Sequence, residues 1–177
     1  MIGKALAIDG WMTEAELLWL AEQAKTHSVI VEIGSYIGRS TRALGDNTSG
    51  VVYAVDNFYG PLDIVYDTEE RYLIYPLFKK HLKDLLDAGR VVPIVADHSK
   101  VELDVVPDMV FIDGDHRYEN VKADILKWRE KLSPGGLLCG HDGGEAGVSE
   151  AVIEITGNLH IVEGTSIWLY PIQTQVQ

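Results

Sequence analysis

The sequence predicts a single α/β domain over residues 1–177, with a Rossmann-like, doubly wound sheet of seven strands. Short apolar strand patterns alternate with helical patterns, which is typical of a parallel sheet with helices on both faces. Two closely spaced strand patterns near the end of the chain leave no room for a helix between them. We therefore expect a mostly parallel sheet that ends in an antiparallel C-terminal hairpin.

Local signals predict the elements in order. Thr13 and Glu16 have the spacing of a capping box, which predicts a first helix with an apolar stripe. A second helix is expected to begin at Arg39, and further helices are expected over residues 77–88 and 118–132. A Ser-Pro-Gly-Gly run fits the end of the last of these helices. Strands are predicted at residues 29–33, 51–55, 91–95, 109–112, 137–140, 160–163 and 166–170.

The loop after the first strand is the most informative segment. The run VEIGSYIGRST places Glu32 in the strand, and Gly34 and Gly38 in a loop that leads into a helix. Glycines let the backbone approach a ligand, and a helix N-terminus attracts an anionic group. Asp56 ends the second strand about 20 residues on, where a carboxylate accepts hydrogen bonds from both ribose hydroxyls. This pairing predicts a nucleoside-containing cofactor.

Three cofactor classes use a glycine loop at this place. A phosphate-binding P-loop has four residues between its glycines and then Lys, whereas only three residues separate Gly34 from Gly38, and Arg39 follows. A dinucleotide fingerprint needs G-x-G-x-x-G, and Tyr36 occupies its second glycine position. The remaining pattern, acid-x-Gly-x-x-x-Gly, suits a cofactor with an amino acid end and an adenosine end. An ordinary strand–turn–helix, with glycines that serve only the turn, stays open.

A second block strengthens the cofactor prediction. Residues 108–144 have the pattern of a strand, a polar turn and a helix that ends at a Ser-Pro-Gly-Gly run. A further strand follows and is succeeded by His141 and Asp142. The glycine loop resembles motif I of the class I S-adenosylmethionine-dependent methyltransferases. The second block closely resembles their family 24 branch, which includes sugar O-methyltransferases of antibiotic pathways. That branch carries D-x-x-H after the fourth strand, matched here by Asp113 and His116. The resemblance covers nearly the whole chain, and a terminal antiparallel strand agrees with the methyltransferase fold.

The resemblance implies S-adenosylmethionine as the cofactor. Its methionine part would contact Glu32 and Gly34, and its ribose would contact Asp56. Its adenine would lie near Asp97 and His98, although a surface histidine is an equal alternative for His98. The complete set of expected cofactor-binding residues is Glu32, Gly34, Ser35, Tyr36, Gly38, Ser40, Thr41, Asp56, Asn57, Asp97, His98 and Asp113.

The expected catalytic residues are His116 and Asp113. Methyl transfer needs alignment, and it needs a base when the acceptor is a hydroxyl, a role suited to a side chain that titrates near neutrality. The resemblance implies His116 as this base and a divalent cation between Asp113 and Asp142. The expected metal ligands are Asp113, His141 and Asp142; carboxylates suit Mg²⁺, whereas a histidine nitrogen favours Mn²⁺ or another transition metal. Two alternatives stay open. His116 could bond the backbone at the start of a helix instead of acting as a base, and Asp113 and Asp142 could form hydrogen bonds instead of binding a metal.

The connection over residues 57–75 is rich in aromatic and acidic side chains. Its aromatic residues are Phe58, Tyr59, Tyr66, Tyr72 and Tyr75. Long connections in compact domains are often lids or binding loops, so these rings are candidates for stacking on a sugar or an aromatic acceptor. The alternative is that they pack a short helix onto the sheet.

The amino acid composition limits the kinds of binding partner that we expect. The net charge of −12, from 27 acids against 15 bases, disfavours a phosphate backbone as a partner, so we expect a small-molecule acceptor and no nucleic acid. No apolar run reaches the length of a membrane span, and the N-terminus lacks a signal-peptide pattern, so we expect a cytoplasmic protein without membrane contact. A chain this short predicts a shallow acceptor pocket, or one completed by a second subunit of a homo-oligomer.

Together these observations predict a small-molecule O-methyltransferase that uses S-adenosylmethionine, assisted by a divalent metal. Two alternatives stay open: a non-catalytic nucleoside-cofactor-binding protein, and an NAD-dependent oxidoreductase on a similar sheet.

Overall fold

The computed structural model describes residues 1–60 and 68–170. Within them, seven strands form one sheet with the order β3-β2-β1-β4-β5-β7-β6. The strands are β1 Val29–Ile33, β2 Val51–Asp56, β3 Val91–Val95, β4 Met109–Ile112, β5 Leu137–Gly140, β6 His160–Ile161 and β7 Trp168–Leu169. The helices are α1 Gly3–Leu6, α2 Glu14–Ala24, α3 Arg39–Asn47, α4 Thr68–His81, α5 Lys83–Asp87, α6 Tyr118–Lys131 and α7 Ala146–Thr156.

The strand order confirms the predicted doubly wound sheet. Strands β1 to β5 pair in parallel, whereas β7 is antiparallel to both β5 and β6. The chain moves outward from β1 to β2 and β3, and then crosses to β4 on the other side of β1. Ligands of open α/β sheets bind beyond the carboxyl ends of the strands at such a switch point. The topology therefore predicts a ligand site at the carboxyl ends of β1 and β4.

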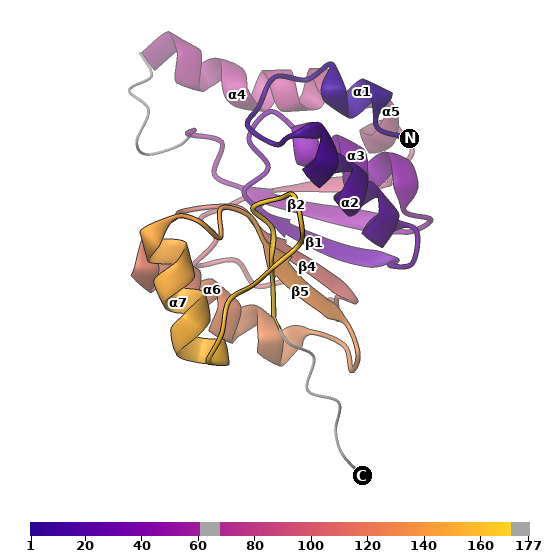
Figure 1. Ribbon diagram of the computed structural model, residues 1–177. Helices are drawn as coiled ribbons and strands as arrows, with labels where there is room; N and C mark the ends of the chain where they lie inside the picture. Colours follow the sequence, from indigo (N-terminus) through magenta and orange to yellow (C-terminus); the bar gives the residue numbers. More distant parts are fainter. Residues whose placement is uncertain (61–67, 171–177) are drawn as a thin grey trace.

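Helices cover both faces of the sheet. Helices α1 to α5 lie on one face, and α6 and α7 lie on the other (Figure 1). Alternate strand residues serve the two cores, as Ile30 of β1 packs in the first and Val31 in the second. Because each central strand is buried on both faces, its sequence is a continuous apolar run.

Two local predictions at helix starts are confirmed. At α2, the Thr13 hydroxyl accepts a hydrogen bond from the Glu16 amide, and the Glu16 carboxylate accepts one from the Thr13 amide, which completes the capping box. At α3, the N-cap residue is Gly38 with a φ of 96°. A β-carbon at Gly38 would come within 2.9 Å of Leu82, so glycine allows the loop to pack closely against the chain beyond α4.

The helix predicted over residues 77–88 is wrong in both of its boundaries. Helix α4 begins at Thr68, continues through Pro76 and ends at His81, and the separate helix α5 follows. Pro76 removes one backbone hydrogen bond of the helix, whereas Ile74 and Phe78 on either side of it are buried in the first core. Much of the expected long connection is thus helical. Tyr66 lies outside the described residues.

The terminal hairpin is confirmed, although its strands are shorter than expected. Both β6 and β7 have two residues. The turn between them is longer than expected. Within it, the Val162 amide donates a hydrogen bond to the Ile167 carbonyl, and the Thr165 amide donates one to the Val162 carbonyl.

Among residues 1–60 and 68–170, no helix combines the length and apolarity needed to cross a bilayer.

Candidate active site

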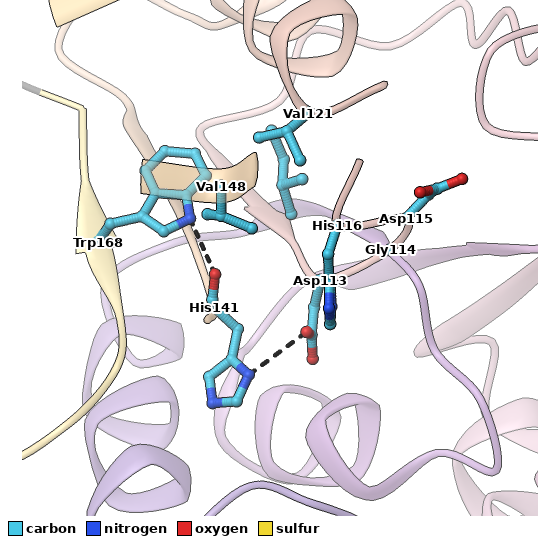
Figure 2. A pocket seen from close by; sticks show the side chains of 9 residues that line it. Asp113, Gly114, Asp115, His116, Val121, His141, Val148 and Trp168 are labelled. Carbon is cyan, nitrogen blue, oxygen red and sulfur yellow. Dashed lines mark hydrogen bonds and ion pairs between the residues drawn. The ribbon is translucent and has the colours of Figure 1, made fainter. Parts of the chain in front are cut away.

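The carboxyl ends of the central strands bring the expected site residues to one edge of the sheet. Glu32 lies in β1 and Asp56 ends β2, whereas Asp113 directly follows β4 and His141 directly follows β5. Figure 2 shows Asp113, His116 and His141 around a small pocket at this edge, with Trp168 on its apolar side. Residues from four strands therefore meet at the predicted place.

The glycine loop touches the loop after β4. Gly34 has a φ of 86°, and a β-carbon added to it would lie 2.0 Å from the carbonyl oxygen of Asp113. Only glycine permits this approach. Gly34 therefore lets the expected cofactor loop lie directly against the segment that carries Asp113.

Glu32 is a fully buried acid with one oxygen to spare. Its Oε2 accepts hydrogen bonds from the Ser35 hydroxyl at 2.7 Å and the Thr41 hydroxyl at 2.5 Å. Its Oε1 is buried without a hydrogen-bond partner. Burial raises the pKa of Glu32 to about 7. An unpartnered carboxylate oxygen beside the loop fits the ammonium group of an amino acid cofactor.

Asp56 holds the glycine loop through backbone hydrogen bonds. Its Oδ2 accepts from the amides of Ser35 and Tyr36, both at 2.8 Å, and its Oδ1 accepts from the Phe58 amide at 2.5 Å. A carboxylate has about four lone-pair sites, so capacity remains for ribose hydroxyls. The ribose contact stays a prediction, but Asp56 has a second role in shaping the loop that sequence reasoning did not include.

The residues expected near adenine are engaged with their own surroundings. His98 Nδ1 lies 2.9 Å from Oδ1 of buried Asp124 on α6, and this partner raises the pKa of His98. The Asp97 carboxylate accepts from the amide and hydroxyl of Ser99. Asn57 likewise caps its own turn, since its side-chain oxygen accepts from the Tyr59 amide. Their contacts with the cofactor stay predictions.

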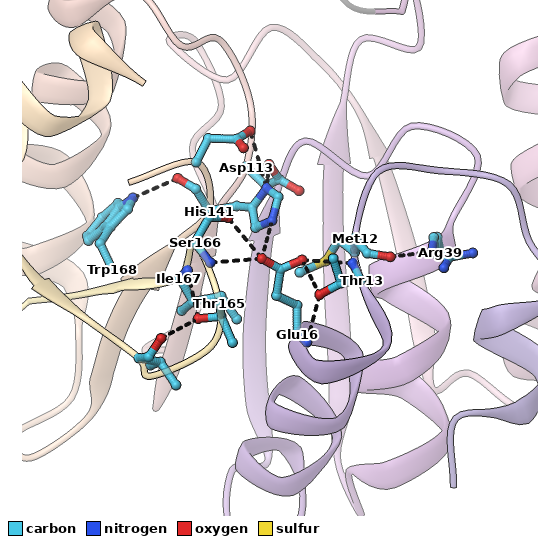
Figure 3. Close-up of polar contacts among 12 residues, drawn as sticks. Met12, Thr13, Glu16, Arg39, Asp113, His141, Thr165, Ser166, Ile167 and Trp168 are labelled. Atoms are coloured by element: carbon cyan, nitrogen blue, oxygen red, sulfur yellow. Dashed lines mark hydrogen bonds and ion pairs between the residues drawn. The ribbon is translucent and has the colours of Figure 1, made fainter. Parts of the chain in front are cut away.

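His141 lies at the centre of a carboxylate cluster. Its Nδ1 is 3.2 Å from Asp142 Oδ2 and 3.5 Å from Asp113 Oδ1, and its Nε2 is 3.2 Å from Glu16 Oε1 (Figure 3). Burial acts to lower the pKa of His141, but the hydrogen bonds and charges of Asp113 and Asp142 outweigh it and raise the pKa to about 11. The cluster is therefore a place that attracts a positive charge.

The three expected metal ligands are brought together. Asp113, His141 and Asp142 each offer one ligand atom, and these atoms lie within 4.8 Å of one another. Burial raises the pKa of Asp113; at Asp142 burial acts in the same direction, but the neighbouring His141 outweighs it and lowers the pKa. Two carboxylates and an imidazole are a donor set that fits Mn²⁺ or a similar divalent cation.

His116 lies at the mouth of this cluster. Its side chain is 47% exposed, and its Nε2 lies 3.1 Å from Asp142 Oδ2. A histidine held by a carboxylate on one nitrogen has the other nitrogen available as a base. The Asp142 carboxylate is therefore the side-chain partner of His116, and such a partner is what orients a histidine that acts as a base.

One residue of the site escaped sequence reasoning. Glu16 was expected only to cap α2, yet its Oε1 points at His141. The capping box accounts for one carboxylate oxygen, and no local signal assigns the other, because Ser166 lies 150 residues away in the sequence.

The aromatic residues after β2 divide into two groups. Phe58 is buried, with its ring centroid 4.6 Å from that of Tyr75 and 5.0 Å from that of Phe78. Tyr59 and Tyr72 are exposed. Packing therefore explains the first group, whereas the second remains available for an acceptor.

A family model described as a methyltransferase domain matches residues 31–143, which is more than half of the chain. The chain belongs to methyltransferase family 24. The match runs from β1 to just beyond β5, so it includes the glycine loop and also Asp113, His141 and Asp142, but not Glu16. Family membership confirms the resemblance to S-adenosylmethionine-dependent methyltransferases and decides against an NAD-dependent oxidoreductase.

One curated relative is similar to this family 24 chain in sequence, and two solved structures are similar to it in fold. The protein y4gI of Sinorhizobium fredii is 29% identical over 132 residues, and the match covers 71% of this chain but only 14% of that protein. S-adenosylhomocysteine (SAH)-bound PaMTH1 of Podospora anserina superposes with a TM-score of 0.68 at 12% identity, covering 90% of this chain and 78% of that one. The calicheamicin methyltransferase CalS11 gives 0.61 at 16% identity, with the same coverages.

Proposed function

We propose that this chain transfers a methyl group from S-adenosylmethionine to a hydroxyl of a small molecule, with a sugar as the favoured acceptor and a divalent cation assisting. The observation that carries the proposal is the meeting of Asp113, His116 and Asp142 at the sheet edge, in contact with the glycine loop through Gly34. A base and a cation site beside a cofactor loop are the parts that O-methylation of an unactivated hydroxyl needs.

The cofactor supplies an electrophilic methyl group on a sulfonium. On the protein side, the free Oε1 of Glu32 receives the ammonium end, Asp56 receives the ribose, and Asp97 and His98 border the adenine. This assignment is supported by membership of the family and by the unpartnered oxygen of Glu32.

His116 acts as the general base for the acceptor hydroxyl. Asp142 Oδ2 lies 3.1 Å from Nε2 of His116, and an Nε2–H that donates to this carboxylate orients the ring and leaves Nδ1 as the basic nitrogen. The exposure of His116 at the rim lets an acceptor reach it from solvent. Its imidazolium, once formed, is stabilised by the same carboxylate.

A divalent cation held by Asp113, His141 and Asp142 supplies Lewis acidity that lowers the pKa of an acceptor hydroxyl. The protein contributes the ligand geometry: the two loops after β4 and β5 each bring one carboxylate, and His141 adds a nitrogen. That nitrogen favours Mn²⁺ over Mg²⁺.

The acceptor proposal is supported by charge and by exposed aromatic residues. The net charge of −12 disfavours nucleic acid, and Tyr59 and Tyr72 offer rings for stacking. CalS11 is named as a TDP-rhamnose 3'-O-methyltransferase, and a nucleotide sugar is accordingly the first acceptor class to test. A second copy of the chain, in a homo-oligomer, would complete the acceptor side.

A two-step experiment tests the function. Calorimetric titration with SAH and with NAD, each with and without Mn²⁺, identifies the cofactor. Incubation with methyl-labelled S-adenosylmethionine and a panel of sugar nucleotides then tests transfer, with mass spectrometry locating the label. We expect SAH binding and an O-methyl product. Binding of NAD alone would overturn the cofactor assignment, and binding without transfer to any acceptor would favour the non-catalytic alternative.

A further inference from the structure

The Glu16 carboxylate is buried where three parts of the chain meet. Its Oε2 accepts from the Thr13 amide at 2.7 Å and the Thr13 hydroxyl at 2.8 Å. Its Oε1 accepts from the amide and hydroxyl of Ser166, both at 2.9 Å. The residue is only 3% exposed. Four donors from the start of α2 and from the β6–β7 turn therefore fix the position and direction of this side chain (Figure 3).

The fixed carboxylate faces one nitrogen of His141, and the expected cation site faces the other. Glu16 Oε1 lies 3.2 Å from Nε2, whereas Asp113 and Asp142 lie on the Nδ1 side. Nε2 is buried and makes no hydrogen bond of good geometry, so the Glu16 carboxylate is the nearby group that can accept from it. With a cation on the Nδ1 side, a protonated Nε2 facing Glu16 leaves the lone pair of the neutral ring on Nδ1. The indole of Trp168 also donates to the His141 carbonyl at 3.0 Å, which anchors the backbone beneath the ring.

We propose that Glu16 is a positioning residue for the metal centre. It holds the Nε2–H tautomer of His141 and directs Nδ1 toward a divalent cation between Asp113 and Asp142. Histidine ligands of metals commonly donate their second ring N–H to a carboxylate in this way. The inference rests on the metal part of the proposed function and extends it to a residue that lies outside the matched family segment.

The arrangement has a consequence for the fold. Because Glu16 is held by both α2 and the β6–β7 turn, the two ends of the domain support a ligand that follows β5. A capping residue thus serves helix and metal site at once. The neutral variant Glu16→Gln cannot serve both sides, because its amide offers one oxygen to the donors that two carboxylate oxygens now accept.

The first test measures Mn²⁺ affinity, by the electron paramagnetic resonance signal of free Mn²⁺, in the wild type and in Glu16→Gln. We expect binding to weaken about 10- to 100-fold in Glu16→Gln. Glu14→Gln, an exposed acid of the same helix, is the matched control and should keep the wild-type affinity. Equal Mn²⁺ affinity in folded Glu16→Gln and in wild type would overturn the positioning role, while leaving the metal proposal intact.

A second measurement uses the wild type and does not depend on the folding of a variant. Long-range ¹⁵N NMR of the histidine rings with Zn²⁺ bound reports which nitrogen of His141 is protonated, with the signal assigned by its loss in His141→Ala. We expect a protonated Nε2 and a metal-bound Nδ1. The opposite tautomer would overturn the inference. A wild type that binds neither Mn²⁺ nor Zn²⁺ would overturn both this inference and the metal part of the proposed function.

Discussion

At the level of single residues, the pKa values of two buried glutamates are shifted in opposite directions. Burial acts to raise the pKa of both. At Glu32 burial prevails, although the hydroxyls of Ser35, Ser40 and Thr41 act to lower the pKa. At Glu16 the hydrogen bonds from Ser166 and Thr13 outweigh it, and the pKa is lowered to about 2. The greater burial of Glu32 and the larger number of donors at Glu16 together decide which acid is ionised.

The raised pKa of Glu32 predicts that cofactor binding releases protons. At pH 6.5, below the value of about 7, much of Glu32 carries a proton, and an ammonium group at Oε1 favours its loss. Calorimetric titration of SAH in buffers of different ionisation enthalpy should give enthalpies that depend on the buffer. Glu32→Gln should remove this dependence, whereas the exposed control Glu14→Gln should keep it. A buffer-independent enthalpy in the wild type would contradict the role of Glu32.

Substitution of His116 should lower the rate of methyl transfer without changing the affinity for the cofactor. Removing a positioned base typically lowers the rate by a factor of about 10² to 10⁴. Because His116 points at Asp142 rather than at the glycine loop, His116→Gln should leave SAH affinity nearly unchanged. Near-normal turnover in His116→Gln would transfer the role of base to His141 or to the cation alone.

At the scale of elements, the site depends on loops that hold one another. The glycine loop is bound to β2 through Asp56, and Gly34 packs against the loop after β4. Asp56→Ala should therefore weaken SAH binding by more than about 1.5–3 kcal/mol, the range for one hydrogen bond to a charged group, because it also releases the amides of Ser35 and Tyr36. Calorimetry measures the change; unchanged affinity in a folded variant would remove Asp56 from the site.

A cation bound by the loops after β4 and β5 should be required for methyl transfer but not for folding of the protein. Excess chelator is expected to abolish methyl transfer and to leave the circular dichroism spectrum unchanged, since the sheet is held by its strands and both cores. Added Mn²⁺ should restore the rate. If activity persists in excess chelator, Asp113 and Asp142 are hydrogen-bonding groups instead, and Asp113 would then contact the amino group of the cofactor.

At the scale of the whole molecule, Glu16 links the beginning of the domain to its end. Its folded pKa of about 2 lies below the ordinary 4.5, so its stabilising effect is fully present above pH 4.5 and is lost as pH falls toward 2. The shift corresponds to roughly 3 kcal/mol of unfolding free energy. Urea unfolding of wild type and Glu16→Gln should differ most near pH 6 and converge as pH falls. Glu22→Gln, an exposed control, should show no such convergence.

Local sequence patterns were sufficient to predict several strands, one helix start and most of the site. Apolar runs between turn residues predicted β1, β3, β4 and β5 with their observed bounds, and the capping box predicted the start of α2. Since parallel strands end at a common edge, the residues after those strands predicted most of the candidate site. Helix α7, between β5 and β6, was not assigned from its sequence.

The pairing of side chains that are distant in the sequence could not be predicted from local patterns. The continuation of α4 through Pro76 depends on packing against the first core, and the contact of His98 with Asp124 depends on α6 lying beside the end of β3. The second role of Glu16 depends on a turn 150 residues further along the chain. Such contacts connect residues with no periodic or motif relation, so their geometry exists only once the sheet has assembled and fixed which segments meet.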